Sequence, residues 1–135
     1  KVYNLEDRKV IDGHDFFNAL ICGINRIILE QDLLNKINVF PVPDGDTGTN
    51  LVFTLQPIAE LSEDKIEKNI SSILINIADC ALDFARGNSG TIMAQFFVGM
   101  SEAYDSLETF NVEQLSKAFS KFNICFILSS ENSGK

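Results

Sequence analysis

The sequence predicts an all-α protein built from a succession of helices. Apolar residues recur every three or four positions in one segment after another, which is the spacing of a single helix face. No segment with strand-like alternation competes with this pattern, although residues 124–128 can be read either way. Gly, Pro, Asn and Asp cluster between the periodic segments, where such residues end one helix and start the next.

The composition limits the classes of protein to which the chain can belong. A chain of 135 residues with 45% apolar residues has room for one domain with one core, so we expect a single domain over residues 1–135, in which residues 123–135 are atypical. The net charge of −8 at pH 7 disfavours nucleic acid and anionic membranes as partners. No apolar run approaches the roughly 20 residues that cross a membrane, so no membrane span is expected.

The cysteines Cys22, Cys80 and Cys125 lie far apart in apolar surroundings, without the spacing of a metal site. We interpret all of them as buried thiols, because free cysteine is among the most buried residue types. Thiols that stay reduced, together with the lack of a signal-peptide pattern, predict a cytoplasmic protein.

The first helix is predicted to start after Asp12, an N-cap residue that is followed at Asp15 by an acid suited to the positive end of the helix dipole. It runs to about Leu34. Its apolar face contains Phe17, Leu20, Ile21, Ile24, Ile27 and Ile28.

Residues 38–48 interrupt the helical pattern. Pro41 and Pro43 hold the residues before them in extended conformations, and Gly45 and Gly48 permit tight turns. This stretch is therefore predicted to be a loop.

A second helix is predicted to start near Thr49 or Asn50 and to be over by about Leu61, with Pro57 bending or ending it. We expect Ser62 to cap a third helix that reaches about Phe84, because an acidic turn follows it. After the interruption at residues 87–90 come a fourth helix, to about residue 104, and a fifth from about residue 112.

The loop before the second helix carries a candidate metal site. Asp44 and Asp46 flank Gly45, so a turn there can aim both carboxylates at one small volume. Magnesium favours such oxygen ligands and uses one or two protein carboxylates together with substrate phosphates. Polar side chains at the helix start then make a natural phosphate site: Thr47, Thr49 and Asn50. The alternative is a solvated turn that only caps a helix, since these residue types dominate turns.

A second loop, residues 87–90, again offers small residues and polar donors at a helix start, in Asn88, Ser89 and Gly90. A triphosphate lying between the two loops would receive donors from both. Ser89 is also an ordinary helix cap, and Arg86 can equally be a helix-end cation. Neither loop has the Gly-Lys-Ser/Thr of a Walker motif.

Other polar residues are weaker candidates. His14 lies in the first turn of its helix, where a surface or capping role is favoured over catalysis. Asp79 and Asp83 mark the solvated edge of the third helix. The Phe residues are either packing residues or the walls of an apolar cavity, and the sequence leaves these two alternatives open.

Two segments carry a family resemblance: residues 38–50, Asn-Val-Phe-Pro-Val-Pro-Asp-Gly-Asp-Thr-Gly-Thr-Asn, and residues 85–90, Ala-Arg-Gly-Asn-Ser-Gly. Together they resemble the DhaL-type kinase domain of the dihydroxyacetone kinase L-subunit superfamily. The resemblance extends from about Ile11 to Phe119 and is strongest to the N-terminal ATP-binding domain of the bacterial fatty acid kinase A branch. It implies an antiparallel helical bundle or barrel that binds ATP at one end, with magnesium bridging the phosphates to Asp44 and Asp46 as catalytic residues. Where the dihydroxyacetone kinase branch has a third aspartate, Asn38 lies nearby.

The resemblance also implies phosphate contacts and a reaction. Thr49 and Asn50 correspond to phosphate-binding positions, and Ser89 and Gly90 to the second phosphate loop. The implied reaction transfers the terminal phosphoryl group of ATP to a fatty acid presented by a DegV-type binding protein. The alternatives are a dihydroxyacetone kinase-type phosphotransferase, and an inactive nucleotide-binding or structural fragment of the same fold.

The chain departs from this family at its C-terminal end. Further helices, a glycine-rich nucleotide contact and a Glu-Gly-Thr segment are not found there, which predicts an incomplete barrel and a C-terminally incomplete domain. Activity of this chain alone and a homodimeric state are both left open.

Overall fold

The computed structural model describes residues 10–38 and 44–117. The prediction of an all-α fold is confirmed there, since the β-type pairing among these residues is one isolated bridge between Ile11 and Phe110. Residues 112–117 are also helical, as expected for the fifth helix. The other elements are α1 (Gly13–Leu29), α2 (Gln31–Lys36), α3 (Thr47–Ala59), the 3-10 turn η1 (Glu63–Lys65), α4 (Ile70–Phe84) and α5 (Gly87–Ala103).

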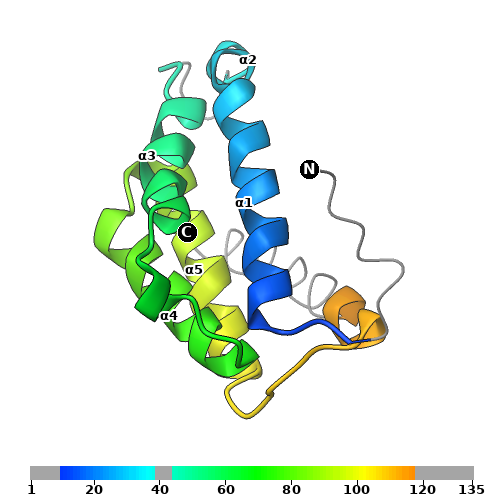
Figure 1. The fold of residues 1–135 in the computed structure, drawn as a ribbon. Coiled ribbons are helices and arrows are strands. Elements are labelled where there is room, and N and C mark those ends of the chain that lie inside the picture. Colours follow the sequence, from blue (N-terminus) through cyan, green and yellow to red (C-terminus); the bar gives the residue numbers. More distant parts are fainter. Residues whose placement is uncertain (1–9, 39–43, 118–135) are drawn as a thin grey trace, which may run out of the picture.

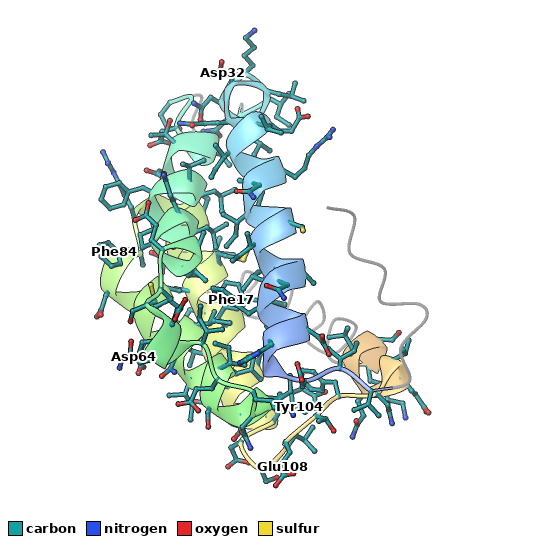
Figure 2. The ribbon with its side chains drawn as sticks, in the orientation of Figure 1. Phe17, Asp32, Asp64, Phe84, Tyr104 and Glu108 are labelled. Atoms are coloured by element: carbon teal, nitrogen blue, oxygen red, sulfur yellow. The ribbon has the colours of Figure 1, made fainter. Side chains whose placement is uncertain are left out.

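The helices form an antiparallel bundle. In Figure 1, α1 and α4 run toward the end of the bundle that carries α2, whereas α3 and α5 run away from it. Asp32 of α2 and Glu108 mark these opposite ends in Figure 2. Helix α3 packs against each of the other four α-helices named above. The core between them is aliphatic and aromatic, and its fully buried members include Ile24, Leu55, Ile58, Ile73, Ile77, Met100 and Phe110.

Aromatic residues at core positions pack against one another. The Phe110 ring meets the rings of Phe16 and Tyr104 edge-on, at centroid distances of 6.2 and 5.0 Å. Such edge-to-face contacts are a favourable arrangement of aromatic quadrupoles. These aromatic residues are therefore packing residues of the core and do not line a cavity.

The start of α1 is as predicted, but its end is not. Asp12 Oδ1 accepts from the Asp15 amide at 2.9 Å, and the Asp12 amide donates to Asp15 Oδ2 at 3.1 Å, which is a reciprocal capping box. The helix does not continue to Leu34. It ends at Leu29, and the chain re-enters a helix at Gln31, so that α2 is a separate short element.

Helix α3 begins at Thr47, slightly earlier than the predicted start near Thr49 or Asn50. It ends at Ala59, soon after Pro57, in agreement with the prediction. Of the loop before it, Pro41 and Pro43 lie outside the described residues.

The prediction that Ser62 caps the third helix is wrong. Ser62 precedes only the 3-10 turn η1, and α4 starts at Ile70 with Asn69 as its cap, whose Oδ1 accepts from the Ser72 amide at 3.1 Å. The cause is tertiary. The amides of Ile70 and Ser71 donate to the carbonyls of residues 108 and 107, both at 2.9 Å, and the Lys68 carbonyl accepts from residue 13. These bonds hold the chain before Ile70 outside the helix.

The second loop also differs from its prediction, because residues 87–90 are not an interruption before α5 but its first turn. The polar groups of that segment therefore lie on a helix start rather than in an extended loop. The expected ambiguity at residues 124–128 and the atypical segment 123–135 lie outside the described residues.

The thiols are only partly as predicted. Cys80 is buried on α4, but Cys22 is exposed, which corrects the expectation of burial. Cys22 lies on α1 beside the exposed Gly23, on the side of the helix that faces away from the core. Cys125 lies outside the described residues. Asp79 and Asp83 are exposed, as expected for the solvated edge of α4.

Cys22 is expected to be alkylated by iodoacetamide in the native protein much faster than Cys80. Burial, with a smaller contribution from the charge of Asp83, raises the pKa of the Cys80 thiol, so less reactive thiolate is present at any given pH. The Cys80 rate should also keep rising above pH 9. Mass spectrometry of the modified peptides measures both sites separately, and equal native rates would contradict the burial of Cys80.

Among the described residues, no helix combines the length and the hydropathy required to cross a membrane.

Candidate functional site

The two polar loops meet at one end of the bundle, where α3 and α5 begin. The Ser89 hydroxyl donates to the Thr47 carbonyl oxygen at 3.1 Å. A Cβ atom on Gly87 would overlap the side-chain amide of Asn50, so these residues are in direct contact. The predicted juxtaposition of the two loops is therefore confirmed.

A buried threonine fixes this arrangement. Thr54 of α3 is fully buried, and its hydroxyl donates to the Asn50 carbonyl at 2.8 Å while accepting from the Arg86 amide at 3.1 Å. Gly90 of α5 lies directly against the Thr54 hydroxyl, without space for a Cβ atom. Gly87 has φ +65°, which glycine adopts without strain. The two glycines of the second loop thus bring the start of α5 onto α3.

The two aspartates converge on an asparagine. Asn38 Nδ2 donates to Asp44 Oδ1 at 2.7 Å and lies 3.5 Å from Asp46 Oδ1. Asp44 is exposed, whereas Asp46 and Asn38 are half-buried. One amide nitrogen therefore lies within reach of both carboxylates, and its partial positive charge offsets their mutual repulsion. The predicted convergence of Asp44 and Asp46 on one small volume is present.

This donor set fits magnesium. Two carboxylates and an amide that can turn its oxygen inward are all hard oxygen donors, and magnesium takes its remaining ligands from water and phosphate. Within residues 10–38 and 44–117 no cluster of three or more His, Cys, Asp or Glu side chains is found. A site with two carboxylates suits a cation that is shared with a phosphate ligand better than one held by protein alone.

Thr49 is held by α2. Its hydroxyl oxygen accepts from Asn35 Nδ2 at 3.0 Å and from Gln31 Nε2 at 3.3 Å, and its amide donates to Asn35 Oδ1 at 3.0 Å. Asp46, the N-cap residue of α3, makes no side-chain capping bond. Asn35 therefore caps α3 from a neighbouring helix.

The remaining predicted residues take varied positions. Asn50 and Gly90 are buried at the contact between α3 and α5, whereas Asn88 is exposed on the first turn of α5. Arg86 is the N-cap residue of α5, and its guanidinium lies 4.8 Å from the centre of the Phe53 ring. His14 is exposed in the first turn of α1, at the other end of the bundle, with Nε2 at 3.2 Å from the Ile66 carbonyl. A surface position for His14 is confirmed.

Sequence reasoning missed Gln31, Asn35 and Thr54. The sequence did contain a signal for Gln31 and Asn35. Side chains four residues apart on a helix share a face, and these two residues come shortly before the acidic loop in the chain. Thr54 interrupts an apolar stripe, which marks a buried hydroxyl with a backbone partner. Gln31, Asn35 and Thr54 each take part in the site through hydrogen bonds to residues on another helix or another turn.

The structure thus brings two helix starts and a pair of aspartates together at one end of an antiparallel helical bundle. The chain belongs to the DAK2 domain family, which it matches over residues 41–124. This match contains α3, α4 and α5, the second polar loop and residues 41–48 of the first, but not Asn38. The family is that of the dihydroxyacetone kinase-type phosphotransferase domains.

Longer proteins from staphylococci are similar to this chain. An uncharacterized protein of Staphylococcus saprophyticus is 38% identical over 109 residues, which are 81% of this chain and 20% of that protein. Uncharacterized proteins of two Staphylococcus aureus strains are 37% identical over 109 residues, which are again 81% of this chain and 20% of each of those proteins. The chain thus spans one fifth of the length of these relatives.

Proposed function

We propose that the chain is the ATP- and magnesium-binding part of a kinase that phosphorylates a fatty acid presented by a DegV-type binding partner. The observation that carries this proposal is the meeting of the helix starts of α3 and α5, through Ser89 and Thr47, beside the aspartate pair. Because such a kinase consumes ATP, we place it in the cytoplasm.

Asp44 and Asp46 are the proposed metal-binding and catalytic residues, with Asn38 as the third ligand through its amide oxygen. The Asn38 amide presents its nitrogen to both carboxylates in the structure, and a half-turn about its last side-chain bond presents the oxygen instead. When bound, magnesium would offset the charge of the phosphates and of these carboxylates. A chain with a net charge of −8 needs such compensation to hold ATP.

The phosphates are proposed to lie between the first turns of α3 and α5, where unpaired helix amides favour anions. The residues proposed to contact them, or to shape the backbone around them, are Thr47, Thr49, Asn50, Asn88, Ser89 and Gly90. Ser89 and Thr47 hold the two turns together by their own hydrogen bond. The Arg86 guanidinium, stacked on Phe53, adds positive charge beside the second turn.

In the proposed reaction a carboxylate oxygen of the fatty acid attacks the terminal phosphorus of ATP. The bond from that phosphorus to the bridging oxygen breaks, and ADP leaves with an acyl phosphate as the second product. The residues of this chain contribute by holding the phosphates in line and by stabilising their charge, which is the main source of catalysis in phosphoryl transfer.

A complete version of this domain is expected to phosphorylate fatty acid readily when a lipid-loaded DegV-type partner is added, and to hydrolyse little ATP with free fatty acid alone. The reason is that the sequence offers nucleotide-type loops but no second polar cluster suited to grip a free carboxylate. Radiolabelled ATP and separation of the acyl phosphate measure the reaction. Equal rates with and without the partner rule out this division of labour, and faster transfer to dihydroxyacetone would identify the other branch of the family.

For the 135-residue chain itself the expected result is binding. Calorimetry with ATP and magnesium, compared with ATP and a chelator, measures it directly. Magnesium-independent binding of equal strength would contradict the proposed role of the aspartates.

A further inference from the structure

The side chain of Asn35 contacts Thr49 through both ends of its amide. Its Oδ1 accepts from the Thr49 backbone amide, and its Nδ2 donates to the Thr49 hydroxyl, both at 3.0 Å. The backbone determines which end is which, because a peptide N–H can only donate and therefore must face the oxygen. The nitrogen must then face the hydroxyl.

This arrangement has a consequence for the hydroxyl proton. A hydroxyl oxygen has two lone pairs, and the amides of Asn35 and Gln31 donate to both of them, at 3.0 and 3.3 Å. The proton of Thr49 is therefore directed away from α2. The oxygen has no lone pair left for a metal ion, and the backbone amide of Thr49 is already used.

We propose that Asn35, assisted by Gln31, is a positioning residue that makes the Thr49 hydroxyl a hydrogen-bond donor to a phosphate oxygen of the nucleotide. This inference rests on the proposed function, since it requires a phosphate at the start of α3. A hydroxyl that donates to an anionic oxygen makes a stronger bond than one between neutral groups. Fixing its direction beforehand also avoids the cost of ordering it when the ligand binds.

The same turn of α2 supports the acidic side of the site. The Asn35 carbonyl accepts from the Asn38 amide at 3.4 Å, and the Asn38 side chain in turn holds Asp44 at 2.7 Å. One short helix thus positions a donor for the phosphate and the aspartate pair. A purely structural role, in which Asn35 only caps α3, predicts a loss of stability that does not depend on the Thr49 hydroxyl.

Asn35→Asp separates these two roles. The variant keeps an acceptor for the Thr49 amide, so the cap on α3 remains, but it replaces the donor that faces the hydroxyl with a second acceptor. The Thr49 hydroxyl then turns its proton toward α2 and away from the ligand. Thr49→Val removes the hydroxyl at nearly constant shape, and Thr49→Ser keeps it.

The experiment measures the Kd of magnesium-ATP by calorimetry for the 135-residue chain, for Asn35→Asp, Thr49→Val and Thr49→Ser, and for the double variant Asn35→Asp with Thr49→Val. Thermal unfolding without nucleotide is measured in parallel. We expect Thr49→Ser to bind within about threefold of the unchanged chain and Thr49→Val about tenfold more weakly, the size of one charge-assisted hydrogen bond. Asn35→Asp should weaken binding by more than tenfold when Thr49 is present.

The added carboxylate also repels ATP directly, but this effect is the same whether residue 49 is Thr or Val. The expected result is therefore a clearly smaller effect of Asn35→Asp in the Thr49→Val background. An equal loss in both backgrounds overturns the inference. A Thr49→Val variant that binds as well as the unchanged chain also overturns the inference. Asp46→Asn then tests the proposed function separately. If this variant still loses binding, the proposed function survives, and if it does not, the proposed function fails together with the inference.

Discussion

Asp46→Asn is expected to weaken magnesium-dependent ATP binding by about 100-fold, or about 2.7 kcal/mol, while the protein stays folded. The variant removes one of the two carboxylates that approach the Asn38 amide, and with it half of the anionic charge available to a shared cation. Without ligand the melting temperature should be unchanged or slightly higher, because neutralising one of two neighbouring carboxylates relieves their repulsion.

Calorimetry and thermal unfolding, each with and without magnesium-ATP, measure this prediction. Asp79→Asn is a matched control, since it makes the same chemical change at an exposed position on α4, outside the site. The control should bind ATP like the unchanged chain. An Asp46→Asn variant that keeps the full stabilisation by the ligand would remove Asp46 from the site.

Gly90→Ala is expected to lower the free energy of unfolding by about 2–3 kcal/mol, although it adds only one methyl group. The new Cβ atom would overlap the Thr54 hydroxyl, which is fully buried and bonded to the Asn50 carbonyl and the Arg86 amide. Either α5 moves away from α3, or Thr54 gives up these bonds. Because the start of α5 belongs to the site, ATP binding should weaken as well.

Urea unfolding followed by circular dichroism measures the loss. Gly23→Ala is the matched control, because Gly23 lies within α1, is exposed and has no atom within 4 Å of its ideal Cβ position. There the same substitution should stabilise the protein by about 0.5–1 kcal/mol through helix propensity. If both variants change stability by the same amount, the close contact between α3 and α5 is not the cause.

The Gly90→Ala prediction depends on the close packing of α3 and α5. The glycines of the second loop were interpreted from sequence as a feature of a phosphate-binding loop. In the structure Gly87 and Gly90 have a packing role too, since they let the first turn of α5 approach Asn50 and Thr54. A single pair of glycines thus serves the stability of the bundle and the geometry of the site.

Features that depend on residues close together in the chain were predictable from the sequence. The helical class follows from apolar spacing, and the start of α1 at Asp12 follows from a capping box formed by residues close in sequence. The meeting of the two loops was also predictable, because both contain polar groups at helix starts that suit one anion, and α3 and α5 do bring them together.

Features that depend on partners distant in sequence could not be predicted in this way, because they require the packing of the whole bundle. Helix α4 starts at Ile70 and not after Ser62, where the sequence predicted its start, because the carbonyls of residues 107 and 108 accept hydrogen bonds from its first amides. Asn35 acquired its role because α2 folds back beside the start of α3, where Thr49 offers a donor and an acceptor. Spacing along the chain shows which side chains share a face, but a hydrogen bond also requires an exact partner across space, and packing supplies that partner.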